Sequence, residues 1–211
     1  MMKLSVVMPV FNEEDILERA CHEFASHFDE TVGANEWQFV FSENGSTDNT
    51  YPELLELVKL DKNVKILKLS RNFKMDGAIA AGINSVDSDA AIIMTANLQD
   101  DPKVIKNFIS KWEEGYEHIY GIVKSRPGKS KIRKFNSRLF YKLVNKFSDS
   151  LIPENVSDYR LVDRKVLDAV KELNEGNRFY RGFFSWVGFK STGVEFDRQT
   201  RFSGTSHAKT L

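Results

Sequence analysis

Residues 90–102 of the chain read AAIIMTANLQDDP, an apolar run that changes abruptly to polar residues. The five apolar residues at the start, Ala90 to Met94, are typical of a buried strand. The end of the stretch is typical of a helix start, because Pro102 needs no hydrogen-bonded N–H in a first turn. The stretch therefore predicts a strand, a polar turn and a helix in direct succession.

The same kind of apolar run occurs at four other places along the chain. Strands are predicted over residues 4–8, where Pro9 ends the run, and over residues 37–41, 64–69 and 118–123. Each run is short and rich in aliphatic or aromatic side chains, as buried strands are. With residues 90–94, the sequence predicts five strands in this part of the chain.

Helices are predicted between these strands. Apolar residues recur at helical spacing from residue 16 to 28, and Cys21 lies on their face, so it is expected in the core. Asn12 is expected to cap this helix and Asp48 the next one, because their side-chain oxygens can accept free N–H groups of a first turn. A helix of small residues is predicted over 76–85.

Strands that alternate with helices indicate an α/β fold with a mainly parallel central sheet flanked by helices. In such sheets, ligands bind beyond the carboxyl ends of the strands. Polar turns follow three of the predicted strands, at residues 9–13, 43–48 and 95–101. These turns are therefore expected to converge on one crevice.

Composition and motifs exclude several classes of protein. The 30 basic and 30 acidic residues cancel, so no nucleic-acid partner is expected. One cysteine excludes an internal disulfide and a cysteine-cluster zinc site. No Gly-x-Gly occurs, and the phosphate-loop spacing of Gly77 and Gly82 is followed by Ile83 instead of lysine. No apolar run reaches the roughly 18–20 residues of a membrane span, and the chain is expected to be intracellular.

A basic segment follows the last of these strands. Residues 121–146 contain nine basic residues and no acidic one. Apolar residues recur there at helical spacing, namely Phe135, Leu139, Phe140, Leu143 and Val144. Such a helix is typical of a membrane surface, where each Lys or Arg contributes about 1 kcal/mol. The alternative is a helix that packs on the core and leaves its charges solvated.

Four sequence blocks, in this order, resemble the inverting family-two glycosyltransferases of GT-A fold. They are SVVMPVFNEE at residues 5–14, ENGSTDNT at 43–50, SRNF at 70–73 followed by Gly77-Ala78, and TANLQDDP at 95–102. A further stretch, DYRLVDR at 158–164, is similar to a segment of the polyprenyl-phosphate sugar transferases, among them dolichol-phosphate mannose synthases and bactoprenol glucosyltransferases.

The resemblance implies one GT-A domain over residues 1–211. Residues 1–123 would form its nucleotide-sugar part, and residues 124–211 an acceptor and membrane-proximal part that ends before a membrane anchor. The implied reaction moves a sugar, with inversion, from a UDP- or GDP-sugar to a polyprenyl phosphate. The implied location is the cytoplasmic face of the membrane, and a homo-oligomer is possible.

Two alternatives to this reaction stay open. A phosphate monoester is mostly a dianion at pH 7 and needs no general base, whereas a saccharide hydroxyl, the first alternative acceptor, needs a carboxylate base. The second alternative is a degenerate, non-catalytic nucleotide-binding domain. The neutral residues Thr95 and Asn97 favour it.

The resemblance assigns residues to each part of the site. The implied nucleotide-sugar contacts are Pro9, Phe11, Glu13, Glu43, Arg71, Ala96 and Asn97. The implied acceptor-phosphate contacts are Arg126, Arg133 and Ser137, and a further arginine expected in the preceding strand is Val123 here. The implied catalytic residues are Asn97, Asp100 and Asp158, and the implied ligands of Mg²⁺ or Mn²⁺ are Asn97, Gln99 and Asp100. Gly45 is expected to serve a tight turn.

The chain departs from the family pattern at the residues that usually hold the metal. Two aspartates are usual where it has Glu43 and Asn44, and Asp-x-Asp is usual where residues 95–97 are Thr-Ala-Asn. Carboxylates bind hard cations best. Three outcomes therefore stay open: a weakened metal site, a site in which Asp100 substitutes, or operation without metal by basic residues.

Overall fold

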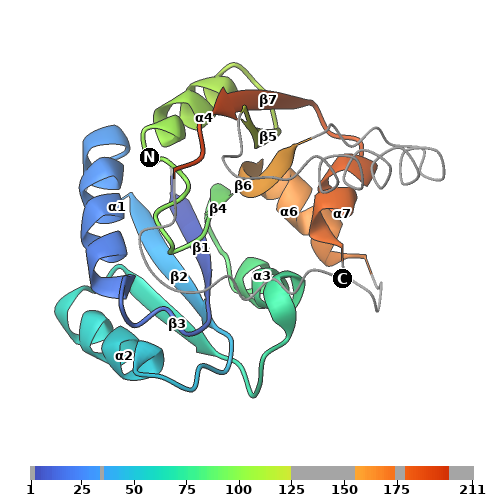
Figure 1. Ribbon diagram of the computed structural model, residues 1–211. Helices are drawn as coiled ribbons and strands as arrows, with labels where there is room; N and C mark the ends of the chain where they lie inside the picture. Colours follow the sequence, from blue (N-terminus) through green and yellow to red (C-terminus); the bar gives the residue numbers. More distant parts are fainter. Residues whose placement is uncertain (1–2, 34–35, 125–154, 174–178, 200–211) are drawn as a thin grey trace, which may run out of the picture.

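The computed structural model has a central sheet with helices packed on it (Figure 1). It describes residues 3–33, 36–124, 155–173 and 179–199. Most of the predicted basic segment lies outside the described residues, and so do the predicted acceptor contacts Arg126, Arg133 and Ser137. Among the residues that are described, no helix is both long and apolar enough to cross a membrane.

Strands and helices alternate through most of the chain, as predicted. The strands are β1 (Leu4–Val10), β2 (Trp37–Glu43), β3 (Val64–Lys68), β4 (Ala90–Ile93), β5 (His118–Val123), β6 (Val156–Asp163) and β7 (Ser191–Phe196). The helices are α1 (Leu17–Thr31), α2 (Thr50–Leu60), α3 (Lys74–Asn84), α4 (Val104–Glu113), α6 (Arg164–Lys171) and α7 (Tyr180–Trp186). The five predicted strands are all present. The sequence pattern does not predict β6 and β7, because polar and charged residues interrupt both.

The seven strands form one sheet in the order β3-β2-β1-β4-β6-β5-β7. β1 pairs parallel with β2 and β4, β2 with β3, and β5 with β7. β6 pairs antiparallel with both β4 and β5. The carboxyl ends of the other six strands and the first residues of β6 therefore lie at the same edge of the sheet. The predicted mainly parallel sheet is confirmed.

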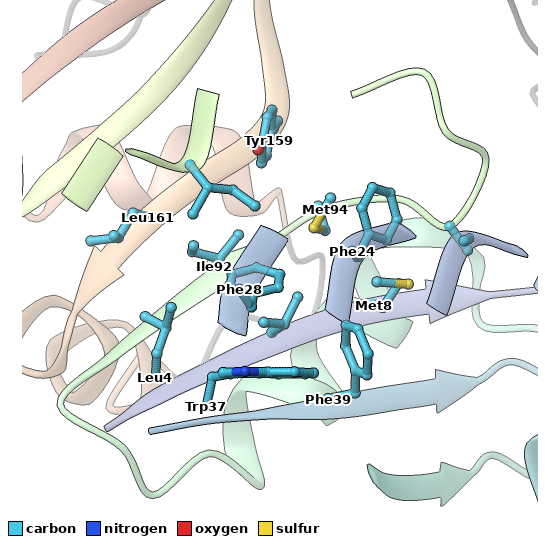
Figure 2. Close-up of a cluster of buried hydrophobic side chains, with 14 of the residues drawn as sticks. Leu4, Met8, Phe24, Phe28, Trp37, Phe39, Ile92, Met94, Tyr159 and Leu161 are labelled. Carbon is cyan, nitrogen blue, oxygen red and sulfur yellow. The ribbon is translucent and has the colours of Figure 1, made fainter. Parts of the chain in front are cut away.

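One face of the sheet is covered by α1 and α4 and holds an aromatic core (Figures 1 and 2). Phe24 and Phe28 of α1 are fully buried, and the Phe28 ring lies 5.3 Å from that of Trp37. Trp37 in turn meets Phe39 edge-on at 4.7 Å, a favourable geometry for aromatic rings. Cys21 is buried in the same cluster, which confirms it as a core residue.

The other face is covered by α3, α6 and α7, which form a second core cluster on the sheet. Gly82 of α3 allows this helix to lie close to β1 and β2. A Cβ atom at Gly82 would collide with the Val7 side chain and lie 2.9 Å from Ser42 Oγ. The missing side chain lets α3 lie directly on β1 and β2, and this fixes the loop that leads into α3 at the carboxyl edge of the sheet.

Several predicted boundaries differ from those observed, and two of them have a clear local cause. β1 does not end at Pro9 but runs to Val10, with Pro9 opposite Ser42 of β2. The carbonyl of Val7 faces β4 and accepts the N–H of Met94, where pairing with β4 ends. Pro9 faces the same side one step further on, so its missing N–H leaves no partner unpaired.

The helix predicted from Asp100 begins instead at Val104. Asp101 Oδ1 accepts the backbone N–H of Lys103 at 3.0 Å, so the residues around Pro102 form a turn of their own before α4.

Candidate functional site

The turns at the carboxyl edge of the sheet form the candidate site. They comprise residues 11–16 after β1, 44–49 after β2, 69–73 after β3 and 94–103 after β4. Asp158 near the start of β6 and Arg198 just beyond β7 belong to the same edge. The pairing of β1 with both β2 and β4 thus brings the three predicted turns together.

Hydrogen bonds lock the turns after β1 and β2 to each other. Asn12 has a left-handed backbone, with φ 54°, and its Oδ1 accepts the N–H of Thr47 at 2.9 Å. Glu14 Oε2 accepts the N–H of Asn49 at 2.7 Å. The predicted capping role of Asn12 is therefore wrong, since α1 begins without a side-chain cap and the Asn12 side chain serves the neighbouring turn.

Asp48 is not the N-cap of α2, which is Asn49 and makes no side-chain cap bond, but Asp48 does bond to the first residue of the helix. Its Oδ1 accepts the N–H of Thr50, where α2 begins. Thr50 Oγ1 in turn accepts the backbone N–H of Glu13 at 2.8 Å. Glu13, a predicted nucleotide contact, is half-buried at this junction, and Phe11 beside it is half-buried while Pro9 is fully buried.

Glu43 and Gly45 shape the turn after β2. Glu43 is 1% exposed, and its Oε1 accepts the N–H of Ser46 at 2.5 Å. Gly45 has φ 75°, and a Cβ atom there would lie 2.8 Å from the backbone carbon of Arg71. The predicted tight-turn role of Gly45 is confirmed. The Glu43 carboxylate holds this turn, and contact with a nucleotide base stays a prediction.

Asn44 joins the turn after β2 to the loop after β3. It is 4% exposed, and its Oδ1 accepts the N–H of Phe73 at 2.8 Å. Its Nδ2 donates to Asn72 Oδ1 and to the carbonyl of Lys74, both at 3.2 Å. These contacts require two N–H donors, which an aspartate lacks. The amide at this position, where the resemblance leads us to expect aspartate, thus has a local structural reason.

Arg71 lies at the exposed rim of the site. Its guanidinium carbon is 3.9 Å from the ring centroid of Phe73, and its Nη1 donates to the carbonyl of Asn72 at 3.2 Å. Phe73 is itself 39% exposed. An arginine stacked on a partly exposed ring offers a flat, cationic surface to a base or a phosphate.

The polar side chains of the turn after β4 bond to one another. Thr95 Oγ1 lies 2.8 Å from Asp100 Oδ2 and 2.9 Å from Asn97 Oδ1. Asn97 Oδ1 also accepts the N–H of Gln99 at 3.1 Å, and Asn97 Nδ2 donates to Gln99 Oε1 at 3.2 Å. Ala96 is 2% exposed and packs into the core below. The turn is therefore held by its own polar groups.

Asp100 is a buried carboxylate with an arginine beside it. The residue is 2% exposed, and its Oδ1 accepts no hydrogen bond from the described residues. Arg198 Nε lies 3.8 Å from this oxygen and likewise has no hydrogen-bond partner there. Burial raises the pKa of Asp100, while Arg198 and the bonds from Thr95 oppose that rise. The negative charge of Asp158 raises the pKa of Asp100 further, so the two carboxylates interact electrostatically.

The segment beyond β7 lies across this turn. Gln199 donates its N–H to the carbonyl of Gln99 at 3.1 Å, and Gln99 Nε2 lies 3.4 Å from the carbonyl of Gln199. Sequence reasoning misses Arg198 as a site residue. The short, partly polar β7 that delivers it gives no strand signal of its own, so no local pattern could have found it.

The predicted metal ligands do not offer a set of converging oxygens. The oxygens of Asn97 and Gln99 bond within the turn, and the Asp100 carboxylate faces a guanidinium. Hard divalent cations prefer several carboxylate oxygens at roughly 2.0–2.6 Å. Over the described part of the chain, no three His, Cys, Asp or Glu side chains are placed to hold a metal. The residues as arranged do not fit a divalent cation, and their metal role stays a prediction.

Val123 stands where an arginine was expected. Its side chain is 2% exposed in β5, opposite Phe196 of β7. The position is therefore part of the core and could not present a cation to a ligand. Lys124 follows it, and its Nζ lies 3.7 Å from Glu195 Oε2.

Comparison with known proteins identifies the family. The profile described as "Glycosyl transferase family 2" matches residues 5–171. The chain belongs to glycosyltransferase family 2. An uncharacterized glycosyltransferase of Synechocystis is 39% identical over 203 residues, which are 96% of this chain and 63% of that protein. This glycosyltransferase therefore spans less than two thirds of that relative's length.

Relatives with a more specific name also match this family-2 glycosyltransferase. The prophage bactoprenol glucosyl transferase homolog of Escherichia coli K12 is 36% identical over 206 residues, covering 96% of this chain and 66% of its own length. The bactoprenol glucosyl transferase of Shigella phage SfX is 36% identical over 208 residues, covering 97% and 67%.

Solved structures confirm the predicted GT-A fold of this glycosyltransferase. Glucosyl-3-phosphoglycerate synthase of Mycobacterium tuberculosis, crystallised with Mn²⁺, UDP and glucosyl-3-phosphoglycerate, has a TM-score of 0.64 at 15% identity, over 97% of this chain and 73% of that one. Residues 1–349 of S. aureus TarS give a TM-score of 0.63 at 15% identity, over 92% of this chain and 58% of that one. At this identity the likeness is one of fold.

Proposed function

We propose that this protein transfers a sugar, with inversion, from a nucleoside-diphosphate sugar to a polyprenyl phosphate. The observation that carries the proposal is the 36% identity, over nearly the whole chain, to proteins named bactoprenol glucosyl transferases. Glucose is accordingly the sugar to test first. The cluster of turns at the carboxyl edge of the sheet supports the proposal, because open α/β sheets bind their ligands there.

The donor nucleoside is assigned to the turns after β1, β2 and β3. Phe11 and Glu13 would line the floor above buried Pro9, and the exposed stack of Arg71 on Phe73 would close the rim. Glu43 Oε1 accepts the Ser46 N–H, so a base would be read by the second carboxylate oxygen of Glu43. The three turns follow strands that are neighbours in the sheet, in the order β3-β2-β1, so they can contact one ligand together.

The diphosphate and the sugar are assigned to the turn after β4 and to β6. Ala96 and Asn97 would lie under the diphosphate, and Asp158 would orient the sugar. In the reaction, the bond from the anomeric carbon to the diphosphate breaks and a bond to the acceptor phosphate oxygen forms. The nucleoside diphosphate leaves with the bonding electrons, and an acceptor that is already a dianion needs no general base. Attack from the face opposite the leaving group inverts the anomeric carbon.

The acceptor would be held by Arg126, Arg133 and Ser137, residues assigned from the family resemblance. A basic segment around them suits an anionic membrane surface, which is where a polyprenyl phosphate is found. The proposal therefore places the working protein at the cytoplasmic face of a membrane, with a homo-oligomer as a possible form.

A non-catalytic nucleotide-binding domain is the second candidate function. The neutral Thr95 and Asn97 favour it, because the two acids left on the turn are Asp100, which is buried, and Asp101, which accepts the N–H of Lys103. The two candidates differ in turnover, which the experiment below measures directly.

The test incubates the purified chain with radiolabelled UDP-glucose or GDP-mannose and undecaprenyl phosphate in detergent. Label extracted into the lipid phase supports the proposal, and NMR of the glycolipid should show the opposite anomer to the donor. Asp158→Asn should abolish transfer, while Glu195→Gln, which alters an exposed carboxylate of β7, should leave it unchanged. Release of the nucleoside diphosphate with no label in the lipid phase, or a retained anomer, would refute the proposed reaction. Nucleotide binding without turnover would favour the second candidate.

A further inference from the structure

We propose that the guanidinium of Arg198, and not a divalent cation, balances the charge of the donor diphosphate at the turn after β4. The inference rests on the proposed function, because it concerns how the same donor is held. It adds a residue that neither the sequence pattern nor the family resemblance assigns.

The first step of the argument is the position of Arg198. β7 runs parallel to β5, so its carboxyl end reaches the same sheet edge as the turns of the site. The backbone bond from Gln199 to Gln99, at 3.1 Å, fixes the following residue to the turn. The Arg198 side chain is 27% exposed, with Nε turned inward. Its outer nitrogens are therefore the part of the guanidinium that a ligand at this edge can meet.

The second step is the incomplete pairing of Arg198 with Asp100. The 3.8 Å between Nε and Asp100 Oδ1 is within ion-pair range but too long for a hydrogen bond. Asp100 thus holds the arginine by charge without using its N–H donors. Donors of a guanidinium can bind phosphate oxygens in pairs, which makes arginine well suited to a diphosphate.

The third step is the charge of the turn. Thr95 and Asn97 are neutral, and the negative charge of Asp100 is matched by the positive charge of Arg198. A divalent cation added here would face a guanidinium of like charge, and Asp101, the other acid of the turn, already accepts the N–H of Lys103 at 3.0 Å. The donor diphosphate suits the pair of Arg198 and Asp100 instead. It would contact the guanidinium of Arg198, while the Asp100 carboxylate is buried.

Asp100 is therefore a positioning residue in this arrangement. Its Oδ2 lies 2.8 Å from Thr95 Oγ1 and its Oδ1 faces Arg198, so one carboxylate connects the turn to the segment beyond β7. Removal of either contact would release the arginine from the edge of the site.

The test measures binding of UDP and GDP to the purified chain by calorimetry, first in EDTA and then with Mn²⁺ or Mg²⁺. The wild type should bind one nucleotide in EDTA, with an affinity that metal changes less than about threefold. Arg198→Gln should weaken that binding roughly ten- to hundredfold, the usual range for a lost charged hydrogen bond. Arg198→Lys should restore part of it, because the charge returns without the paired donors.

Lys190→Gln is the matched control, since it removes one positive charge at the other end of β7, where Lys190 stacks on Tyr116. It should bind nucleotide as the wild type does, and thermal melting should show that every variant is folded. Binding that is lost in EDTA, restored by Mn²⁺ and unaffected in Arg198→Gln would overturn the inference and leave the proposed function standing. A wild type that binds neither nucleotide in either condition would overturn both.

Discussion

Asn44 Oδ1 accepts the backbone N–H of Phe73 at 2.8 Å, and this bond ties the turn after β2 to the loop after β3. The same amide donates to two oxygens of that loop. The loop carries Arg71 at the rim of the site, so the position of one predicted nucleotide contact depends on a buried amide in a neighbouring turn. A carboxylate at Asn44 could accept the bond from Phe73 but could not donate the other two.

Replacing this amide should therefore destabilise the fold. Asn44→Asp sets a carboxylate oxygen against Asn72 Oδ1 and the carbonyl of Lys74, and we expect a loss of about 1–3 kcal/mol in the free energy of unfolding. Urea denaturation measures it. Asn49→Asp adds the same charge at an exposed position and should change stability by less than about 0.5 kcal/mol. Equal effects of the two variants would show that the amide bonds contribute nothing.

Gly45 is expected to be more sensitive to substitution than another glycine of the same backbone class. Gly45→Ala combines a left-handed backbone with a Cβ atom 2.8 Å from the Arg71 backbone, whereas Gly115→Ala, with φ 86°, meets no atom closer than Lys190 Nζ at 3.9 Å. Strain alone costs about 1–2 kcal/mol, and crowding should add about 1–3 kcal/mol at Gly45. Chemical denaturation of both variants separates the two contributions. Similar losses in both would contradict the close approach to Arg71.

Two added carboxylates should create the metal dependence that the present turn does not support. Thr95→Asp combined with Asn97→Asp surrounds Asp100 with acids, and we expect Mn²⁺ affinity to rise by roughly tenfold or more. Calorimetric titration with Mn²⁺ measures it. Asn107→Asp combined with Ser110→Asp adds the same charge on the exposed side of α4 and serves as control. Strong Mn²⁺ binding by the unaltered chain would show that its turn already holds a cation.

His118 should make stability depend on pH. It is 2% exposed between Tyr120 and Phe184, and burial, with Arg160 nearby, holds its pKa well below the ordinary value of 6.5. Below pH 6.5 the unfolded chain takes up a proton that the folded chain refuses, so stability falls as the pH falls. The slope from this one group approaches about 1.4 kcal/mol per pH unit.

His118→Phe keeps an aromatic ring in the same pocket and should remove this part of the slope, as measured by urea denaturation between pH 5 and 7. His22→Phe, an exposed histidine of α1, is the matched control and should keep the wild-type slope. An unchanged slope in His118→Phe would mean that the folded protein accepts the proton at His118.

Local patterns were sufficient for much of the fold. The apolar runs predict β1 to β5, and the helical spacing from residue 16 to 28 predicts the face of α1 that carries Phe24 and Phe28. These strands and this helix bury residues that are close together in the chain. Such burial is visible in the sequence as a periodic pattern of apolar residues. Of the two unpredicted strands, β7 is an edge strand and carries the exposed Glu195, and β6 ends at Asp163, which accepts bonds from Trp112 Nε1 and the N–H of Lys165.

The sequence by itself determined the family, the α/β alternation and the turns that form the candidate site, because each is written in residues close together in the chain. The tertiary structure alone decided three features: the antiparallel insertion of β6 between β4 and β5, the hydrogen bond from Phe73 to Asn44, and the contact of Asp100 with Arg198. Each of these joins segments far apart in the sequence. Their contacts depend on which strands become neighbours in the sheet. This strand order is fixed when the helices on both faces bury their apolar sides against the sheet.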